Sequence, residues 1–345
     1  MSEQEVDPGR FAEWLRSETG RAGPVAIEPL RGGGSCEMFT LTQGDERFVI
    51  RRAPPVAVSD SAHNVIREYR IIAALTGSAV RVPRLLASCA DPAVLGAPFY
   101  IMGFVEGEVI RRRLPAAYCE HPEVQPAIGE ELIDALVELH AFDWRGTAIE
   151  DLAKPENFLQ RQVARWMSQL AGYRQRELPG VDAVAHWLDD NRPSAGELTV
   201  MHGDFKIDNA LYSAGLPPRL LCLLDFEMTT VGDPLIDLAW AMIFWPEEGN
   251  PIAIAPPGSE GGMHAQYCQA PEALVQRYAA QTGRNLDAFQ WYQAFAAWKL
   301  GIVLEASYSR FLKGESRNPN HEFFGFLVDQ LMQRANRFAF AGEQP

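Results

Sequence analysis

Two short apolar runs near the middle of the chain each lead to an acidic residue. Residues 198–201 (LTVM) are followed after one turn by Asp204, and residues 220–224 (LLCLL) run directly into Asp225. Apolar runs of this length between turn residues indicate buried strands. The chain therefore brings a carboxylate twice from a buried strand into a loop, where functional side chains concentrate. This arrangement predicts a site of chemistry rather than of packing.

The polar residues around these carboxylates restrict that chemistry. Lys206 and Asn209 follow Asp204 closely, and Asp225 opens an Asp-Phe-Glu tripeptide. Phosphoryl transfer requires a carboxylate that accepts the proton of the attacking hydroxyl, amide and carboxylate oxygens that hold Mg²⁺ on the phosphates, and a cation for the developing charge. We assign these roles to Asp204, to Asn209 with Asp225, and to Lys206. The alternative is that these are ordinary polar loop residues of an α/β domain.

Three motifs in this stretch together resemble the signature of the aminoglycoside phosphotransferase and choline kinase family, which is related to the protein kinases. They are His202-Gly203-Asp204 with Asn209, Asp225-Phe226-Glu227, and Gly232-Asp233-Pro234 followed by Asp237-Leu238-Ala239. The resemblance implies an α+β, bilobal protein-kinase-like fold. It also implies a phosphotransferase that uses ATP and Mg²⁺ and takes a hydroxylated small molecule as acceptor.

Other residues of these motifs are expected to have structural roles. His202 would fix the loop by packing and hydrogen bonds, and Phe226 would fill a hydrophobic slot. Asp233 would cap the following apolar helix, and Asp237 would be a buried hydrogen-bond acceptor for the catalytic loop. For Lys206, a salt bridge with Asp204 or its neighbour Asp208 is the alternative to a role at the γ-phosphate.

The pattern of the N-terminal third is that of a sheet, and the remainder is mainly helical. Alternating apolar residues predict an antiparallel five-stranded sheet plus a helix for residues 1–103, the nucleotide-binding lobe. Residues 104–345 would form a larger, mostly helical lobe for catalysis and acceptor binding. Strands are predicted at 25–30, 39–42, 47–52, 82–86 and 98–102, and helices at 10–20, 61–75, 130–140, 157–173, 184–188, 271–282, 286–313 and 321–338.

The resemblance places a phosphate-binding loop at the glycine run. Backbone N–H groups of Gly33, Gly34 and Ser35 would approach the triphosphate without intervening side chains. Cys36 stands where related enzymes usually have asparagine. A flexible turn is the alternative interpretation of a triple glycine.

Four further residues are predicted to contact the nucleotide. Arg51 stands where protein kinases carry the lysine that binds the α and β phosphates, and Glu68 on the 61–75 helix is its expected partner. A solvated salt bridge on that helix is the alternative for Glu68. Met102 and Phe104 lie in the expected hinge, residues 102–107, whose backbone would bind adenine.

The acceptor is less well defined than the reaction. Residues 245–270 are rich in proline and glycine, which predicts a long loop that could cover the acceptor site. Arg111-Arg112-Arg113 either meets a carboxylate or acyl-CoA phosphates or forms a solvated basic face. Segments such as VIRRAPP, REYRIIAAL and PFYIMGFVEG resemble the kinase-like domains fused to some acyl-CoA dehydrogenases. That branch implies a hydroxy acid or hydroxyacyl-CoA, whereas aminoglycoside-like and choline-like acceptors stay open.

Bulk properties argue against some classes of partner. A net charge of −14 disfavours nucleic acid and anionic membranes. No window approaches the roughly 20 apolar residues of a membrane span, and the first ten residues have no signal-peptide core, so we expect a cytoplasmic protein. The five cysteines show no metal-binding spacing and are expected to be reduced thiols. The oligomeric state is not predicted.

Two other functions compete with a small-molecule kinase. Arg51 and Cys36 differ from stricter kinases, which is compatible with a catalytically impaired, nucleotide-binding regulatory module. Protein kinase activity is disfavoured because Gly232-Asp233-Pro234 follows Asp225-Phe226-Glu227 too closely for an activation segment.

Overall fold

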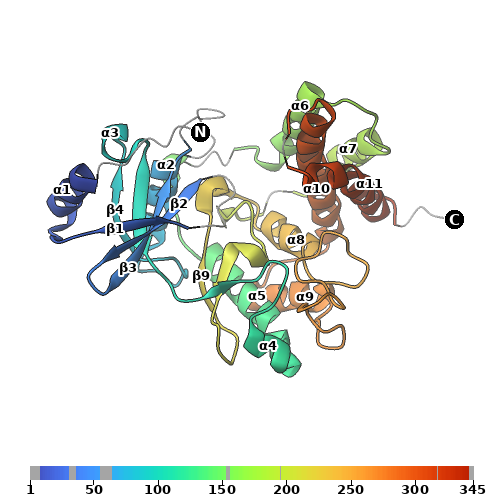
Figure 1. Cartoon of the computed structure of the whole chain (residues 1–345). Coiled ribbons are helices and arrows are strands. Elements are labelled where there is room, and N and C mark those ends of the chain that lie inside the picture. The colour runs from blue at the N-terminus through green and yellow to red at the C-terminus, as the bar shows by residue number, and fades with distance from the viewer. Residues whose placement is uncertain are drawn as a thin grey trace.

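The strands of the N-terminal third and the helices of the remainder occupy opposite sides of the molecule (Figure 1). A computed structural model describes residues 8–30, 36–54, 64–152, 156–194, 196–316 and 318–341. The predicted α+β, bilobal fold with a five-stranded antiparallel sheet is confirmed. None of the helices in the described ranges is both long and apolar enough to cross a bilayer.

The elements follow one another in the order expected for such a fold. The N-terminal part contains α1 (Pro8–Thr19), β1 (Ala26–Pro29), β2 (Glu37–Gln43), β3 (Glu46–Arg52), α2 (Val65–Leu75), β4 (Leu85–Cys89), α3 (Pro92–Leu95) and β5 (Phe99–Gly103). The remainder contains β6 (Glu108–Val109), α4 (Ala116–Glu120), α5 (Pro126–His140), α6 (Gln162–Tyr173), α7 (Val181–Asp190), β7 (Thr199–Met201), β8 (Ala210–Tyr212), β9 (Leu220–Leu223), β10 (Thr230–Gly232), α8 (Leu235–Ile243), α9 (Pro271–Thr282), α10 (Phe289–Leu312) and α11 (Asn320–Ala339).

The N-terminal sheet has the order β1-β2-β3-β5-β4, and all neighbouring strands are antiparallel. Side chains alternate between its two faces. Phe48 and Ile50 of β3 pack in one apolar cluster with Phe11 of α1, whereas Val49 packs in the other cluster with residues of α2. Arg51 has the same parity as Val49, so the strand delivers its guanidinium to the α2 side.

Helix α2 begins where the sequence supplies a cap. The Asn64 side chain accepts a hydrogen bond from the Arg67 backbone N–H at 2.9 Å, which satisfies one of the unpaired donors of the first turn. Val65, Ile72 and Leu75 are buried on the face toward the sheet, and Glu68 is buried with them. A carboxylate is thereby placed among apolar side chains opposite β3.

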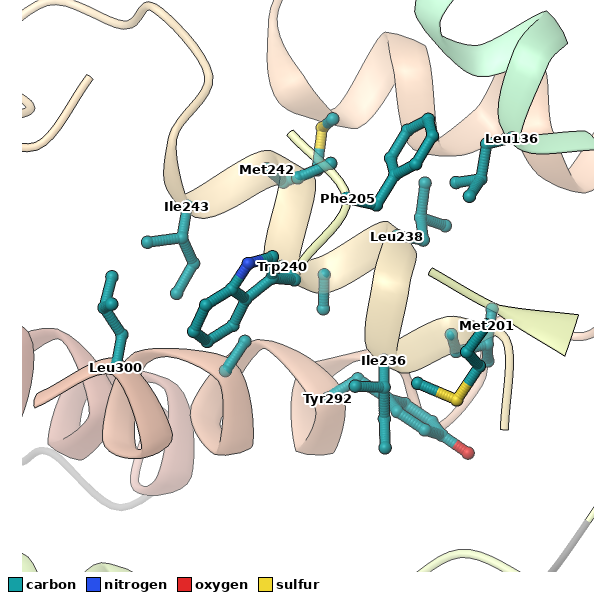
Figure 2. Close-up of a cluster of buried hydrophobic side chains, with 14 of the residues drawn as sticks. Leu136, Met201, Phe205, Ile236, Leu238, Trp240, Met242, Ile243, Tyr292 and Leu300 are labelled. Carbon is teal, nitrogen blue, oxygen red and sulfur yellow. The ribbon is translucent and has the colours of Figure 1, made fainter. Parts of the chain in front are cut away.

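The core of the helical part is built around α10. This helix is buried along most of its length and contacts α6, α7, α8 and α11. Figure 2 shows Trp240 of α8 lying between α8 and α10, close to Leu300 and Ile243. The aromatic residues of the predicted 286–313 helix are therefore mainly core residues, as their density in the sequence indicates.

Several element boundaries differ from the prediction. Strand β4 begins at Leu85 rather than at residue 82, consistent with Pro83, which has no N–H for a strand ladder. The helix predicted from residue 157 begins at Gln162, after a single 3₁₀ turn at Leu159–Arg161. The short elements α3, α4, β6, β8 and β10 were not predicted, because segments of two to five residues are too short to show a helical or a strand period. Residues 61–63 of the predicted 61–75 helix lie outside the described residues.

Arg81 joins the N-terminal sheet region to the helical part. Its Nε and Nη2 donate to the two carboxylate oxygens of Glu138 on α5 at 2.9 and 2.7 Å, and its Nη1 donates to the Leu220 carbonyl at 3.0 Å. Nη1 also pairs with Glu131, whose side chain is 10% exposed. This half-buried network fixes the connection between α2 and β4 against α5 and β9.

We expect Arg81→Ala to lower the free energy of unfolding by about 1–3 kcal/mol, because two carboxylates on α5 lose a shared partner in a half-buried site. Chemical denaturation measures this change. Arg84→Ala, at an exposed position nearby, is the matched control and should change stability by at most about 0.5 kcal/mol. Equal changes in the free energy of unfolding for the two substitutions would contradict the structural role given to Arg81.

Candidate active site

Two strand ends bring the predicted catalytic residues into adjoining loops. Strand β7 ends at Met201 and is followed by His202, Gly203 and Asp204, while β9 ends at Leu223 two residues before Asp225. Gly203 has φ +85°, and a Cβ there would lie 2.4 Å from the Met228 carbonyl oxygen. Only glycine fits this turn, in which the His-Gly-Asp loop passes closely beside the Asp-Phe-Glu loop.

The fully buried carboxylate of Asp237 holds the first loop. Its Oδ2 accepts the His202 N–H at 2.6 Å, and its Oδ1 accepts the Gly203 N–H at 3.0 Å. The His202 ring donates from Nε2 to the Leu224 carbonyl at 2.8 Å and accepts the Asp204 N–H at Nδ1 at 3.4 Å. The structural roles predicted for these two residues are confirmed.

Asp233 also has a structural role at the start of α8, although Pro234 and not Asp233 occupies the N-cap position. Its Oδ1 accepts the Leu235 N–H at 3.1 Å, and its Oδ2 accepts the Tyr292 hydroxyl at 2.8 Å. Burial raises the pKa of the Asp233 carboxyl, while these two hydrogen bonds oppose the rise. The residue thus fixes the start of α8 against α10.

Both oxygens of the Asp204 carboxylate are oriented by neighbouring side chains. Oδ1 accepts the Trp240 indole N–H at 2.8 Å, and Oδ2 accepts the Asn209 amide N–H at 2.9 Å. Asn209 also donates to the Asp204 carbonyl at 2.9 Å. With its Nδ2 bound in this way, Asn209 retains its amide oxygen as a potential metal ligand.

Asn209 and Asp225 line one cavity of about 410 Å³ between the sheet and the helical part. The Leu224 N–H donates to the Asn209 carbonyl at 2.8 Å, which places the two loops side by side. Asp225 has φ +66°, a left-handed conformation that aspartate adopts more readily than most residues. The hinge residues Met102 and Phe104 line the same cavity. The structure therefore brings together the predicted metal ligands and the predicted adenine-binding segment.

Arg51 forms the ion pair predicted with Glu68 and also contacts Asp225. Its Nε lies 2.8 Å from Glu68 Oε2, and its Nη2 donates to Asp225 Oδ1 at 2.6 Å. The Glu68 side chain is only 2% exposed, so its alternative interpretation as a solvated salt bridge is wrong. Glu227 lies further away, with Oε2 3.7 Å from Nη2.

Electrostatics in this cluster favour a permanently charged Arg51. Burial alone would lower the pKa of its guanidinium, but the charges of Glu68 and Asp225 more than compensate and raise that pKa. Burial raises the pKa of the Glu68 carboxyl, and the neighbouring Arg51 charge limits the rise. Glu68 also accepts the Phe226 N–H at 3.0 Å, which ties α2 to the Asp-Phe-Glu loop.

Lys206 lies between two carboxylates. Its Nζ is 3.4 Å from Asp204 Oδ2 and 3.6 Å from Asp208 Oδ1. Burial would lower the pKa of this ammonium, but the two carboxylates raise it on balance, so Lys206 is charged at neutral pH. The salt bridges considered for Lys206 are present, and they leave its cation next to Asp204.

The predicted phosphate-binding loop and the predicted lid loop are not placed at this cavity by the described residues. Gly33, Gly34 and Ser35 lie outside the described residues, so their role at the phosphates stays a prediction. The 245–270 segment has no helix or strand. It is tied to the stretch after the hinge through the Leu114 N–H, which donates to the Gly261 carbonyl at 2.8 Å, and the Ala255 N–H, which donates to the Arg111 carbonyl at 3.1 Å.

Two further residues, Trp240 and Arg67, contribute to the site and were not predicted from the sequence. Trp240 lies in an apolar helix and has the appearance of a core residue, yet its indole N–H binds Asp204. Arg67 donates from Nη1 to the Glu227 carbonyl at 3.0 Å and so helps to hold the second loop. The tryptophan directly after Asp-Leu-Ala was the available signal, because a buried indole N–H requires an acceptor.

The donor set suits a magnesium ion that is shared with phosphates. Amide and carboxylate oxygens of Asn209 and Asp225 are hard ligands of the kind that Mg²⁺ prefers. Within the described ranges, no group of three His, Cys, Asp or Glu residues could hold a metal by itself. The two residues therefore fit an ion that completes its coordination with nucleotide oxygens and water.

Comparison with solved structures defines the class of protein. The structure matches that of a candidate aminoglycoside phosphotransferase from Ralstonia eutropha with a TM-score of 0.82 and 27% identity, covering 98% of this chain and 99% of that one. It matches aminoglycoside phosphotransferase APH(4)-Ia, in a ternary complex with AMP-PNP and hygromycin B, with a TM-score of 0.60 and 15% identity over 97% and 99% of the two chains. The second likeness shows the shared fold alone.

Comparison of sequences defines the family. The profile of the phosphotransferase enzyme family matches residues 26–295. The chain is 30% identical over 335 residues to acyl-CoA dehydrogenase family member 11 of Gallus gallus. The alignment covers 94% of this chain but only 42% of that relative. The protein therefore belongs to the phosphotransferase enzyme family, and it spans less than half of the length of this relative.

We expect Asp237→Ala to destabilise the protein by about 2–5 kcal/mol, because the buried His202 N–H and the partly buried Gly203 N–H lose their acceptor. Denaturant unfolding measures the change in the free energy of unfolding. Asp237→Asn keeps one acceptor oxygen and should cost less. The exposed Asp190→Ala is the control and should be nearly neutral. A neutral Asp237→Ala would contradict the assignment of Asp237 as the anchor of this loop.

Proposed function

We propose that this protein is an ATP- and Mg²⁺-dependent phosphotransferase that moves the γ-phosphate to a hydroxyl group of a small molecule. The observation that carries the proposal is that Asn209 and Asp225 line one cavity together with the hinge, while Asp204 is hydrogen-bonded to Asn209 in the adjoining loop. Family membership supports phosphoryl transfer as the reaction class. The structure of an aminoglycoside phosphotransferase of the same fold with AMP-PNP supports an adenine nucleotide as donor.

In the proposed mechanism, Asp204 accepts the proton of the acceptor hydroxyl. Trp240 and Asn209 hold the two oxygens of its carboxylate, so the base is oriented before the acceptor arrives. Lys206, held next to Asp204, would stabilise the negative charge that develops on the transferred group. Asn209 and Asp225 would hold Mg²⁺, which neutralises phosphate charge when it is bound.

Arg51 and the hinge would position the nucleotide. The guanidinium of Arg51 lies at the wall of the same cavity as Met102 and Phe104. Guanidinium groups bind phosphate oxygens in pairs, so arginine can replace the lysine of protein kinases here. The apolar lining of the cavity, which includes Val49, Ile72 and Leu223, suits the faces of an adenine ring.

For the acceptor, we propose a hydroxy acid or its CoA ester. The similarity to an acyl-CoA dehydrogenase family member over 94% of this chain supports an acyl substrate. Arg111 lines the cavity, and Arg112 beside it is exposed. A carboxylate or the phosphates of CoA could bind these cations.

A location in the cytoplasm stays a prediction from the sequence.

One observation favours a second candidate, a nucleotide-binding module without catalysis. The Arg51 guanidinium occupies Asp225 Oδ1, the group that would hold the metal. Such a module would bind nucleotide and show a thermal shift without forming a phosphorylated product.

Asp204→Asn tests the proposed reaction. The amide has nearly the same shape but accepts no proton, so we expect kcat to fall by roughly 10²- to 10⁴-fold. Nucleotide binding, followed by thermal shift with ATP and Mg²⁺, should be retained. The exposed Asp190→Asn variant is the control and should keep full turnover. Undiminished phosphate transfer by Asp204→Asn would end the proposal.

A screen of acceptors tests the substrate class. ATP consumption with hydroxy acids, hydroxyacyl-CoA esters, aminoglycosides and choline-like alcohols should give the highest kcat/KM for the first two groups. If a CoA ester is used, Arg112→Ala should raise KM for the ester more than KM for the free hydroxy acid. A clear preference for a cationic acceptor would overturn the acyl assignment, and nucleotide binding without product in every reaction would favour the second candidate.

A further inference from the structure

Lys299 is a buried cation next to the proposed catalytic base. It lies on α10 and is 9% exposed. Its Nζ is 4.2 Å from the centre of the Trp240 ring and 5.3 Å from the centre of the Trp166 ring. Within the described part of the chain, Lys299 makes no hydrogen bond and no ion pair. The groups of the described chain nearest to its ammonium are therefore aromatic faces, and no carboxylate is in contact with it.

Burying the Lys299 ammonium costs free energy of desolvation, which suggests that its charge has a role. An ammonium group that loses most of its contact with water loses most of its hydration, and a cation–π contact restores only part of it. The surrounding sequence, AFAAWKLGIVL, is otherwise apolar, so leucine or methionine would fill the site at lower cost. Burial lowers the pKa of the Lys299 ammonium to about 8, which leaves it mainly charged at neutral pH.

Trp240 connects this cation to the base. The same indole that lies under Lys299 Nζ donates its N–H to Asp204 Oδ1 at 2.8 Å. A positive charge over the ring draws electron density from the indole, which makes its N–H a stronger donor. Figure 2 shows Trp240 between α8 and α10, so the connection crosses the helix interface of the core.

We propose that Lys299 is a positioning residue for phosphoryl transfer, and that its charge, acting through the Trp240 indole, strengthens the hydrogen bond that orients Asp204. The inference rests on the proposed function for its catalytic consequence. The link from Lys299 to the indole N–H is a property of the protein alone and can be measured without any acceptor.

The charges around Lys299 come from three elements. Asp237 of α8 and Asp204 of the catalytic loop raise the pKa of its ammonium, and Arg165 of α6 lowers it. Burial outweighs the two carboxylates and acts in the same direction as Arg165, so the pKa stays below the ordinary lysine value. In the described ranges, α7 and α11 contribute no charge that acts on Lys299. The ammonium is thus charged below pH 8 and loses its proton above it.

Nuclear magnetic resonance of ¹⁵N-labelled indole groups tests the link directly. The Trp240 resonance is assigned by its loss in Trp240→Phe. In the wild-type protein with no ligand, its shift should move with a midpoint near pH 8, in parallel with the ¹³Cε resonance of Lys299. In Lys299→Met this midpoint should disappear. A Trp240 resonance that ignores pH in the wild type would overturn the inference while leaving the proposed reaction intact.

Kinetics test the catalytic consequence, with the best acceptor found in the screen. We expect Lys299→Met to lower kcat by about 2- to 30-fold, the range of a desolvated cation–π contact, with KM for ATP unchanged. In the Trp240→Phe background, which keeps a ring but removes the N–H, the same substitution should have a much smaller effect. Lys313→Met, at an exposed position after the same helix, should leave kcat unchanged.

The outcomes separate a positioning role from a packing role. Equal losses from Lys299→Met in both backgrounds would mean that the residue acts by packing, and the inference would fail. If Lys299→Met does not fold, the wild type and Trp240→Phe decide the question, because kcat of the wild type should decline above pH 8 and that of Trp240→Phe should not. The absence of turnover with every acceptor would instead refute the proposed function, and the resonance titration would still decide the link.

Discussion

The contact on which the site depends is the pair of hydrogen bonds that Asp237 accepts from His202 and Gly203. One buried carboxylate at the start of α8 satisfies two N–H groups of a loop that has no regular structure. Because α8 packs on α10, the position of the loop is set by the core of the helical part. The position of Asp204 is therefore determined by Asp237 and by the packing of α8 on α10.

The fold and most of the site follow from local patterns in the sequence. Apolar runs that end at Asp204 and Asp225 indicate strand ends, and the spacing to Asn209 indicates an adjoining turn. The contact of Arg51 with Asp225, by contrast, joins residues 174 positions apart. Neither segment predicts this contact, because a strand arginine has several possible partners and only the assembled sheet and α2 select one.

The roles of Trp240 and Lys299 were hidden for a different physical reason. Both lie in helices whose composition is that of a core, and a helical period reports which face is buried but not what a buried polar atom touches. The indole N–H and the ammonium become informative only when their neighbours in space are known. Sequence periodicity therefore predicts that such residues are buried, but it does not predict the hydrogen-bond or charge partners of their polar atoms.

The network at Arg81 limits how the two parts of the protein can move. Its guanidinium is bound at once to two carboxylates of α5 and to the carbonyl of Leu220 at the start of β9. Sliding of the sheet along α5 would break all of these bonds together, whereas a small rotation about Arg81 would preserve them. Opening and closing of the cavity between the two parts would then be a rotation about Arg81, with the largest displacement at the edge farthest from this residue.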